Sequence, residues 1–228
     1  SMLEKDYLPE LGHCRVFYMD ENVQRFKDAA SFNLFLSKKF ETYYSCTPIV
    51  NHELLNIRNV TGQYLRARNT IINALLNGND CTKYCSGTSP ESMVFRSSLY
   101  STGTYDSKTK PEMDHGTKEV LREIQDFLME SIGIRRCFSE LYKVLLGEKY
   151  GVRQGIIPIY LASRLVALND MPVIYLHDRE VDVTAEILNN LNEKPDEYYL
   201  YIEKKSGDKE QYLNALEQLF LMQENVAS

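Results

Sequence analysis

The sequence lacks the short motifs by which many enzymes of nucleotide and metal chemistry are recognised. It contains no GxxxxGK(S/T) or GxGxxG loop that would cradle phosphates and no HExxH helix that would hold zinc. Its four histidines are scattered, and His177-Asp178, at the end of a predicted strand, is the one pairing that suits a small hydrolase. Residues of these types at a strand end are usually turn formers. We therefore predict no catalytic residue and keep an independent hydrolase only as a third alternative.

The cysteines have neither the number nor the spacing of a disulfide framework or a zinc site. There are five, and Cys81 and Cys85 stand with three residues between them and no second pair nearby, whereas a structural zinc site needs four ligands. His13 and Cys14, neighbours on a predicted strand, would point to opposite faces and so could not act as base and nucleophile. A reducing compartment is the simpler interpretation. We expect a cytoplasmic protein with no metal or other cofactor in this chain.

Long apolar runs and an excess of positive charge are also missing. No run approaches the roughly 20 residues that span a bilayer, so we expect no membrane contact. The net charge of -6 and pI of about 5.4 argue against a wholly basic surface, although a local basic patch remains compatible with them. The 228 residues, 43% hydrophobic, are enough for one large domain or two small ones. Ser1-Met2 is typical of residues left after tag removal, which favours a piece of a longer protein.

Hydrophobic periodicity predicts a mainly α protein with a small β element, an α+β fold. Residues that begin or end helices and strands are most frequent from Tyr150 to Asp178. There Pro158 is predicted in the first turn of a helix, and the run Val173 to Leu176 is predicted as a buried strand. Further elements are predicted from apolar spacing, caps and turn residues. They are helices at about 23–44, 52–57, 64–76, 90–100, 117–132, 138–146, 184–192 and 209–223, and strands at about 14–19, 179–183 and 197–203.

The same pattern suggests a domain organisation. We expect a helical part with a short N-terminal strand at 1–100, an exposed loop at 101–116, and a winged-helix-like part with a C-terminal helix at 117–228. The loop is rich in Ser, Thr, Lys and Asp and has no clear apolar period.

A helix-turn-helix from about residue 138 to 168 would gather several polar and basic side chains. In such a motif the second helix presents its N-terminal residues to base edges. The candidates for nucleic-acid contact are Arg153, Gln154 and Arg164, with Lys143 and Lys149 as phosphate contacts. The alternative is an ordinary solvated face, which the acidic total favours.

The stretch from Asn51 to Asn56 combines polar and apolar side chains, after Pro48 has ended the preceding helix. One interpretation is that Asn51 caps a helix. The other is that Glu53 forms a buried bidentate ion pair with an arginine such as Arg66 or Arg68, which would pin two helices together.

Gly151 and Gly155 bracket a turn ahead of the helix that Pro158 begins. Glycines four residues apart resemble a phosphate loop superficially, but a tight turn alone would explain them.

Four stretches resemble, in the same order, a segment of very large bacterial P-loop ATPases from restriction-type and phage-defence gene clusters, relatives of the Dnd and BREX ATPases. They are Thr47–Asn56, Ala67–Leu76, Thr88–Leu99 and Tyr150–Ala162. The similarity spans about residues 15 to 203. It implies a non-catalytic segment downstream of an ATPase core. Because this chain has no Walker A lysine or Walker B acid, ATP hydrolysis is assigned to none of its residues.

These observations together favour a non-catalytic interaction module of a larger ATP-binding defence protein, contacting DNA or a partner subunit. The alternative is a protein-protein scaffold with no nucleic-acid role, in which the same charges are simply solvated.

Overall fold

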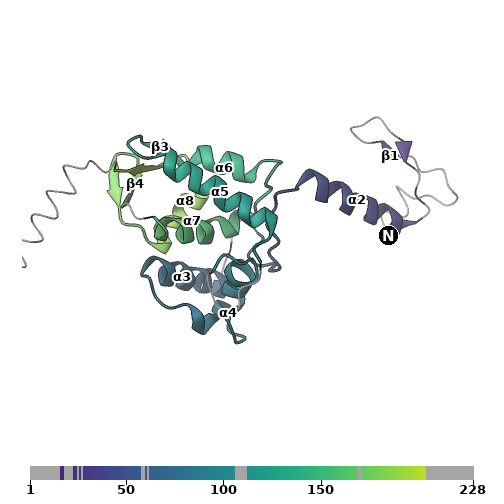
Figure 1. The fold of residues 1–228 in the computed structure, drawn as a ribbon, viewed down its shortest axis with the longest axis horizontal. Helices are drawn as coiled ribbons and strands as arrows, with labels where there is room; N and C mark the ends of the chain where they lie inside the picture. Colours follow the sequence, from purple (N-terminus) through teal and green to yellow (C-terminus); the bar gives the residue numbers. More distant parts are fainter. Residues whose placement is uncertain are drawn as a thin grey trace, which may run out of the picture. The chain divides into compact units, whose positions relative to one another are not determined.

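The computed structural model describes residues 16–17, 23–24, 26, 28–57, 60, 62–105, 112–168 and 171–203, and the chain divides into two compact units at residues 45 and 46 (Figure 1). In the first unit, strand β1 (Val16–Phe17) pairs antiparallel with β2 (Val23–Gln24) and helix α2 (Ala29–Tyr43) follows. The predicted helix therefore begins six residues later than expected, because Asp28 and Ser31 form a reciprocal capping box at its start.

The second unit begins with a helical region. Its elements are α3 (Gly62–Leu76), a short 3₁₀ turn η1 (Thr82–Tyr84), α4 (Pro90–Phe95) and a π-helical continuation η2 (Arg96–Tyr100). The helix predicted at 90–100 is confirmed, with Ser89 as its N-cap. The helix predicted at 52–57 is wrong, because that stretch forms turns in which the side-chain amide of Asn56 donates to the carbonyl of Val50. Asn51 therefore caps no helix.

The chain continues through alternating helices and short strands. In order these are α5 (His115–Glu130), β3 (Arg136–Cys137), α6 (Phe138–Leu146), η3 (Gln154–Ile156), α7 (Ile157–Val166), β4 (Pro172–Leu176), β5 (Arg179–Val181), α8 (Ala185–Glu193) and β6 (Tyr198–Ile202). The predicted mainly α fold with a small β element is confirmed. Helix α5 begins two residues before the predicted start at 117, and Asp114 is its N-cap, because the Asp114 carboxylate accepts from the Thr117 amide.

The four-stranded sheet is antiparallel, in the order β3-β6-β4-β5. The sequence order α5-β3-α6-α7-β4-β5 agrees with a winged-helix-like arrangement. The sheet departs from it, because β5 lies at the edge and β6, which follows α8, lies between β3 and β4. Tyr198, Leu200 and Ile202 of β6 are buried and alternate with half-buried residues, as expected for a strand with one face on the core.

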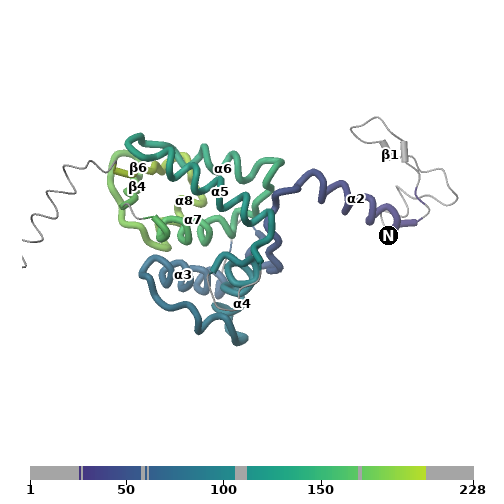
Figure 2. The backbone as a smooth tube through the Cα atoms, in the orientation of Figure 1, coloured from purple at the N-terminus to yellow at the C-terminus, as the bar shows by residue number. Residues whose placement is uncertain are grey.

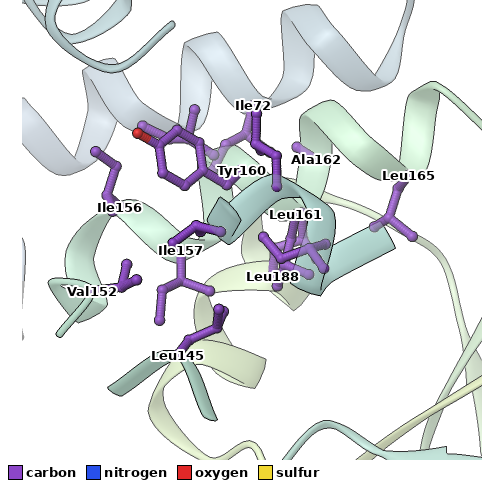
Figure 3. Close-up of a cluster of buried hydrophobic side chains, with 14 of the residues drawn as sticks. Ile72, Leu145, Val152, Ile156, Ile157, Tyr160, Leu161, Ala162, Leu165 and Leu188 are labelled. Carbon is purple, nitrogen blue, oxygen red and sulfur yellow. The ribbon is translucent and has the colours of Figure 1, made fainter. Parts of the chain in front are cut away.

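The core of the second unit is organised around α7. This helix packs against α3, α5 and α8, and Figure 3 shows Tyr160 and Leu161 of α7 among side chains such as Ile72 of α3 and Leu188 of α8. From Ile157 to Ala162 every residue is buried. Full burial of a side chain such as isoleucine or leucine stabilises the folded state by about 1.5–3 kcal/mol. In Figure 2, α3 and α4 lie on one side of α7 and α6 lies on the other.

This core joins the two parts that the sequence separated at 101–116. Ile71 and Leu99, from the predicted N-terminal part, share one hydrophobic cluster with Leu145 and Ile174 from the predicted C-terminal part. Of the predicted loop, residues 106–111 lie outside the described residues, as does the helix predicted at 209–223. Thr102 is buried, and its hydroxyl donates to the carbonyl of Ser98.

Among the described residues, no helix combines the length and the apolar character needed to cross a membrane.

Candidate interaction surfaces

Three of the five residues predicted to contact nucleic acid are exposed. Lys143 lies on α6, and Lys149 and Arg153 lie in the connection from α6 to η3. The Lys149 ammonium is 3.0 Å from the hydroxyl of Tyr150, which in turn donates to Glu123 at 2.7 Å. The hydrogen bond to Tyr150 raises the pKa of Lys149. Lys149 is therefore bonded to Tyr150, and the same tyrosine hydroxyl is also bonded to the carboxylate of Glu123.

The other two predicted contacts are drawn into the fold. The side-chain amide of Gln154 donates to the main-chain carbonyl of Asn192, at the end of α8. Arg164 is half-buried on α7, and this burial lowers the pKa of its guanidinium. A recognition helix must present one face to the major groove. Because α7 is buried from Ile157 to Ala162, Arg153 is the exposed member of the residues predicted to contact base edges, and nucleic-acid contact stays a prediction.

Arg68 is the most buried charged residue in the described part of the chain, with 3% of its surface exposed. Its Nη1 donates to the carbonyl of Gly155 and its Nη2 to Oδ1 of Asn189, both at 2.7 Å. Burial lowers the pKa of Arg68 to about 10, an effect partly offset by Tyr142 and Glu193. At neutral pH the guanidinium is therefore charged, and it links α3 to η3 and to α8.

The predicted ion pair of Glu53 with an arginine of α3 is not formed. Glu53 and Arg66 are both exposed, and Arg68 uses oxygen acceptors of the main chain and of an amide instead of a carboxylate. Arg68 is buried and connects α3 to α8, but it does so through neutral acceptors, so the predicted ion pair with Glu53 is wrong.

Asparagine amides extend this junction. Asn189 donates to Asn69 at 2.7 Å, and the buried Tyr142 hydroxyl donates to Asn192 at 3.0 Å. Burial raises the pKa of Tyr142, so its phenol stays protonated and remains a donor. A hollow of about 340 Å³ lies beside Arg68 and these amides, and Glu186 and Glu193 also line it.

Gly155 lets two chain segments approach closely at this junction. A Cβ atom at this position would collide with the carbonyl oxygen of Leu55 and lie 2.6 Å from that of Ile57. Gly155 is therefore needed for close packing of two chain segments. A tight turn alone, as predicted from the sequence, does not account for this glycine. Gly151 does have the left-handed backbone of a turn, with φ of 54°, and Pro158 occupies the first turn of α7 as predicted.

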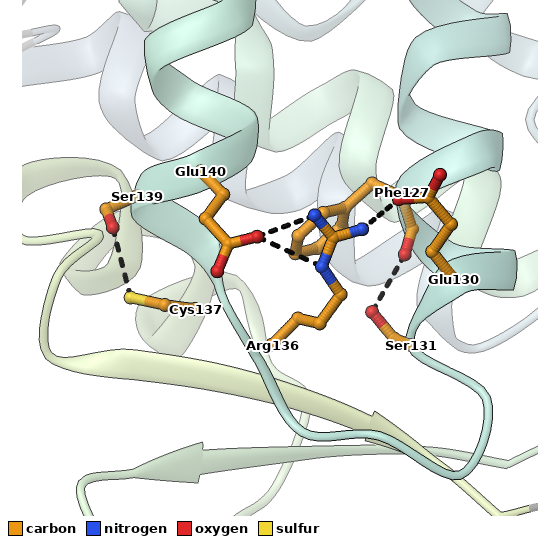
Figure 4. Close-up of polar contacts among 7 residues, drawn as sticks. All are labelled: Phe127, Glu130, Ser131, Arg136, Cys137, Ser139 and Glu140. Atoms are coloured by element: carbon orange, nitrogen blue, oxygen red, sulfur yellow. Dashed lines mark hydrogen bonds and ion pairs between the residues drawn. The ribbon is translucent and has the colours of Figure 1, made fainter.

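The consecutive arginines before α6 are held by local partners. Figure 4 shows the Arg136 guanidinium between Glu130 and Glu140, and it lies 5.2 Å from the centre of the Phe127 ring. The hydrogen bonds to these carboxylates raise its pKa. This cluster ties the end of α5 to the start of α6.

Helix α2 carries an aromatic stripe whose two halves differ in burial. Phe32, Leu36, Phe40 and Tyr43 follow one another at spacings of 4, 4 and 3 residues, which places them along one face. Phe32 is buried and its ring lies 5.2 Å from that of Phe26. Phe40 and Tyr43 are 56% and 41% exposed. The C-terminal half of α2 therefore presents large aromatic side chains at the surface.

A second hollow, of about 280 Å³, lies where the turns after residue 48 meet α4 and η2. Its lining is Ile49, Asn51, His52, Met93, Arg96, Ser97 and Ser101. All of these residues except Ser101 come from two of the four stretches that carry the resemblance described above. Sequence spacing could not have grouped them, since about 40 residues separate the two segments.

Two pairs of side chains have types that occur in catalytic sites, His177 with Asp178 and Cys46 with His115. His177 has a φ of 53° in the turn between β4 and β5, and Asp178, 97% exposed at its side chain, accepts from Arg135 at 3.1 Å. The buried thiol of Cys46 is 4.0 Å from Nε2 of His115. Within the described ranges, no group of three or more His, Cys, Asp or Glu side chains could hold a metal ion.

Comparison of the chain with protein-family models, with curated proteins and with solved structures found no match.

Proposed function

We propose that the chain is a cytoplasmic, non-catalytic interaction module that docks onto a protein partner through the aromatic C-terminal half of α2. The observation that carries this proposal is the exposure of Phe40 and Tyr43 on one helix face. Leu34 and Tyr44 of the same region are also 59% and 39% exposed. Aromatic side chains of this kind are the usual anchors when a helix enters a hydrophobic groove.

The partner that we propose is another subunit or domain of a bacterial phage-defence ATPase assembly. The resemblance of four stretches to such ATPases supports this choice, and so does the lack of phosphate-cradling motifs, which leaves nucleotide chemistry to the partner. DNA is the less favoured partner. The net charge is -6, and α7, which would have to read the bases, is buried on all sides from Ile157 to Ala162.

The test is co-purification of the tagged chain with a separately expressed P-loop ATPase core of the proposed assembly, followed by titration of the purified pair. Phe40→Ala should weaken binding about tenfold or more, because truncation of an aromatic anchor removes more than 1 kcal/mol. Asn33→Ala, at an exposed polar position of the same helix, is the matched control. Alanine favours a helix at both positions, and circular dichroism would verify that both variants keep the helix content of the wild type.

Two results would count against the proposal. One is unchanged affinity of the Phe40→Ala variant for the ATPase. The other is tight duplex DNA binding by the chain alone that weakens steeply with salt, since phosphate contacts would then dominate.

A further inference from the structure

The hollow between residues 49–52 and η2 is lined by residues with buried polar atoms that lack hydrogen-bond partners in the described part of the chain. Arg96 Nε and both ring nitrogens of His52 are buried, and none has a hydrogen-bond partner among the described residues. A buried polar atom left unpaired costs about 1–3 kcal/mol. None of the described residues that line the hollow carries a carboxylate, so none of them neutralises the Arg96 charge there. The combination favours a ligand that supplies negatively charged oxygen atoms.

The local backbone presents Arg96 in an uncommon way. It begins the π-helical segment η2, in which the Ser101 amide donates to the Arg96 carbonyl at 2.7 Å. In this wider turn Ser101 is bonded through its main chain to Arg96, and both residues line the hollow. Single π turns within helices are rare and are frequent at functional sites.

The remaining lining complements an anion and an organic group together. Asn51 and Ser101 bring an amide and a hydroxyl, which can donate to oxygen. His52 is held edge-on to the Tyr64 ring, with centroids 5.1 Å apart, and this contact fixes the orientation of the imidazole. Ile49 and Met93 are 68% and 39% exposed and form the apolar part of the same wall.

We propose that this hollow binds a small organic phosphate monoester. The guanidinium of Arg96 holds the phosphate oxygens, with Asn51 and Ser101 as further donors, and Ile49 and Met93 pack on the organic part. A small ligand fits better than a nucleic acid, because the volume of about 280 Å³ is at the lower end for ligand pockets and the net charge of -6 repels a long polyanion. This inference does not depend on the proposed role of α2.

The test uses phenyl phosphate, inorganic phosphate and phenol as probes, with affinities from isothermal titration and the location from amide chemical shifts. We expect phenyl phosphate to bind saturably and more tightly than inorganic phosphate, and phenol not to bind. Shifts should concentrate at residues 49–52 and 93–101. No saturable binding of either phosphate at tens-of-millimolar concentration, or shifts centred elsewhere, would overturn the proposal.

Variants separate the two halves of the site. Arg96→Gln should weaken phenyl phosphate binding about tenfold or more, while Arg153→Gln, the same charge change at an exposed position, should leave it unchanged. Met93→Ser should weaken phenyl phosphate but not inorganic phosphate. If Arg96→Gln does not fold, Arg96→Lys, which keeps the charge but loses the fork, and Ser101→Ala should each show a smaller loss. Equal binding by wild type and all of these folded variants would contradict the assignment.

A short single-stranded oligonucleotide is the remaining probe. The proposal expects it to bind no better than inorganic phosphate. Tighter binding of the oligonucleotide than of phenyl phosphate, abolished by Arg96→Gln, would show that the hollow receives a nucleic-acid backbone and would overturn the small-molecule assignment.

Discussion

Nη1 of Arg68 donates to the main-chain carbonyl of Gly155 at 2.7 Å, joining residues 87 positions apart in the sequence. The same guanidinium reaches Asn189 on α8, so one side chain connects three elements around α7. A planar fork suits this task, because its N–H groups diverge in fixed directions toward separate acceptors. The residue that we expected to form an ion pair therefore acts as a hydrogen-bonding hub.

Replacing Arg68 by Met should destabilise the fold by about 2–4 kcal/mol. The methionine keeps much of the side-chain volume, but it leaves the carbonyl of Gly155 and the amide of Asn189 without their donors. Urea denaturation would measure the change in the free energy of unfolding. Arg66→Met, two residues earlier and exposed, should change it by no more than about 0.5 kcal/mol. Equal effects of the two substitutions would show that the Arg68 contacts are not structurally important.

Gly155→Ala should be severely destabilising, by about 2 kcal/mol or more, because the added Cβ meets main-chain oxygens of Leu55 and Ile57 that cannot move independently. Gly78→Ala provides the comparison. Gly78 has a φ of 64°, and a Cβ added there would have no atom within 4 Å, so only backbone strain of about 1 kcal/mol opposes alanine at this position. Thermal unfolding of both variants would check this order. A smaller effect at Gly155 than at Gly78 would contradict the close approach.

The stability of the second unit should depend on pH through His52. Burial lowers the pKa of His52 below 6.5, so the unfolded state binds more protons between the folded pKa and 6.5. The contribution of neutral His52 is therefore present above pH 6.5 and is lost as the pH falls through this window. Unfolding midpoints in urea at pH 7.5 and 5.5 should differ more for the wild type than for His52→Phe, which keeps an aromatic ring beside Tyr64. The same pH dependence in both proteins would assign it to other groups.

DNA binding by the purified chain should be weak and should not depend on Gln154 or Arg164, since one is hydrogen-bonded to the carbonyl of Asn192 and the other is half-buried. A fluorescence anisotropy series from about 50 to 200 mM salt would test this, because low salt exaggerates phosphate contacts. Lys143→Ala and Arg153→Ala, at exposed positions, should abolish any residual binding. Retained sequence-specific binding that drops with Arg164→Ala would restore the helix-turn-helix interpretation.

The helices and strands with strong periodicity and clear caps were predictable from the sequence. Helices α3, α7 and α8 and strands β4 and β6 lie within a few residues of their expected positions. The structure of residues 52–57 was not predictable. Its apolar residues have the spacing of one helical turn, but a hydrogen bond from the Asn56 side chain to the carbonyl of Val50 stabilises a turn conformation instead.

The partners of Arg68 could not be predicted, because they lie 87 and 121 residues away and no local pattern specifies them. One signal was available. Arg68 stands at i-3 and i-4 from Ile71 and Ile72, on the apolar face of α3, and an arginine on that face must find acceptors inside the protein. The hollow beside Arg96 also depends on a π turn that periodicity does not reveal.

The middle position of β6 in the sheet has a consequence for synthesis. Because β3 and β4 both pair with the strand that leaves the ribosome last of the four, neither has its full set of main-chain partners until Ile202 has emerged. A nascent chain that stops near Asp196 would hold two open strand edges over an incompletely covered core, the kind of intermediate that recruits chaperones or aggregates. Until the last residues of β6 have been translated, the second unit therefore lacks the strand that joins β3 to β4.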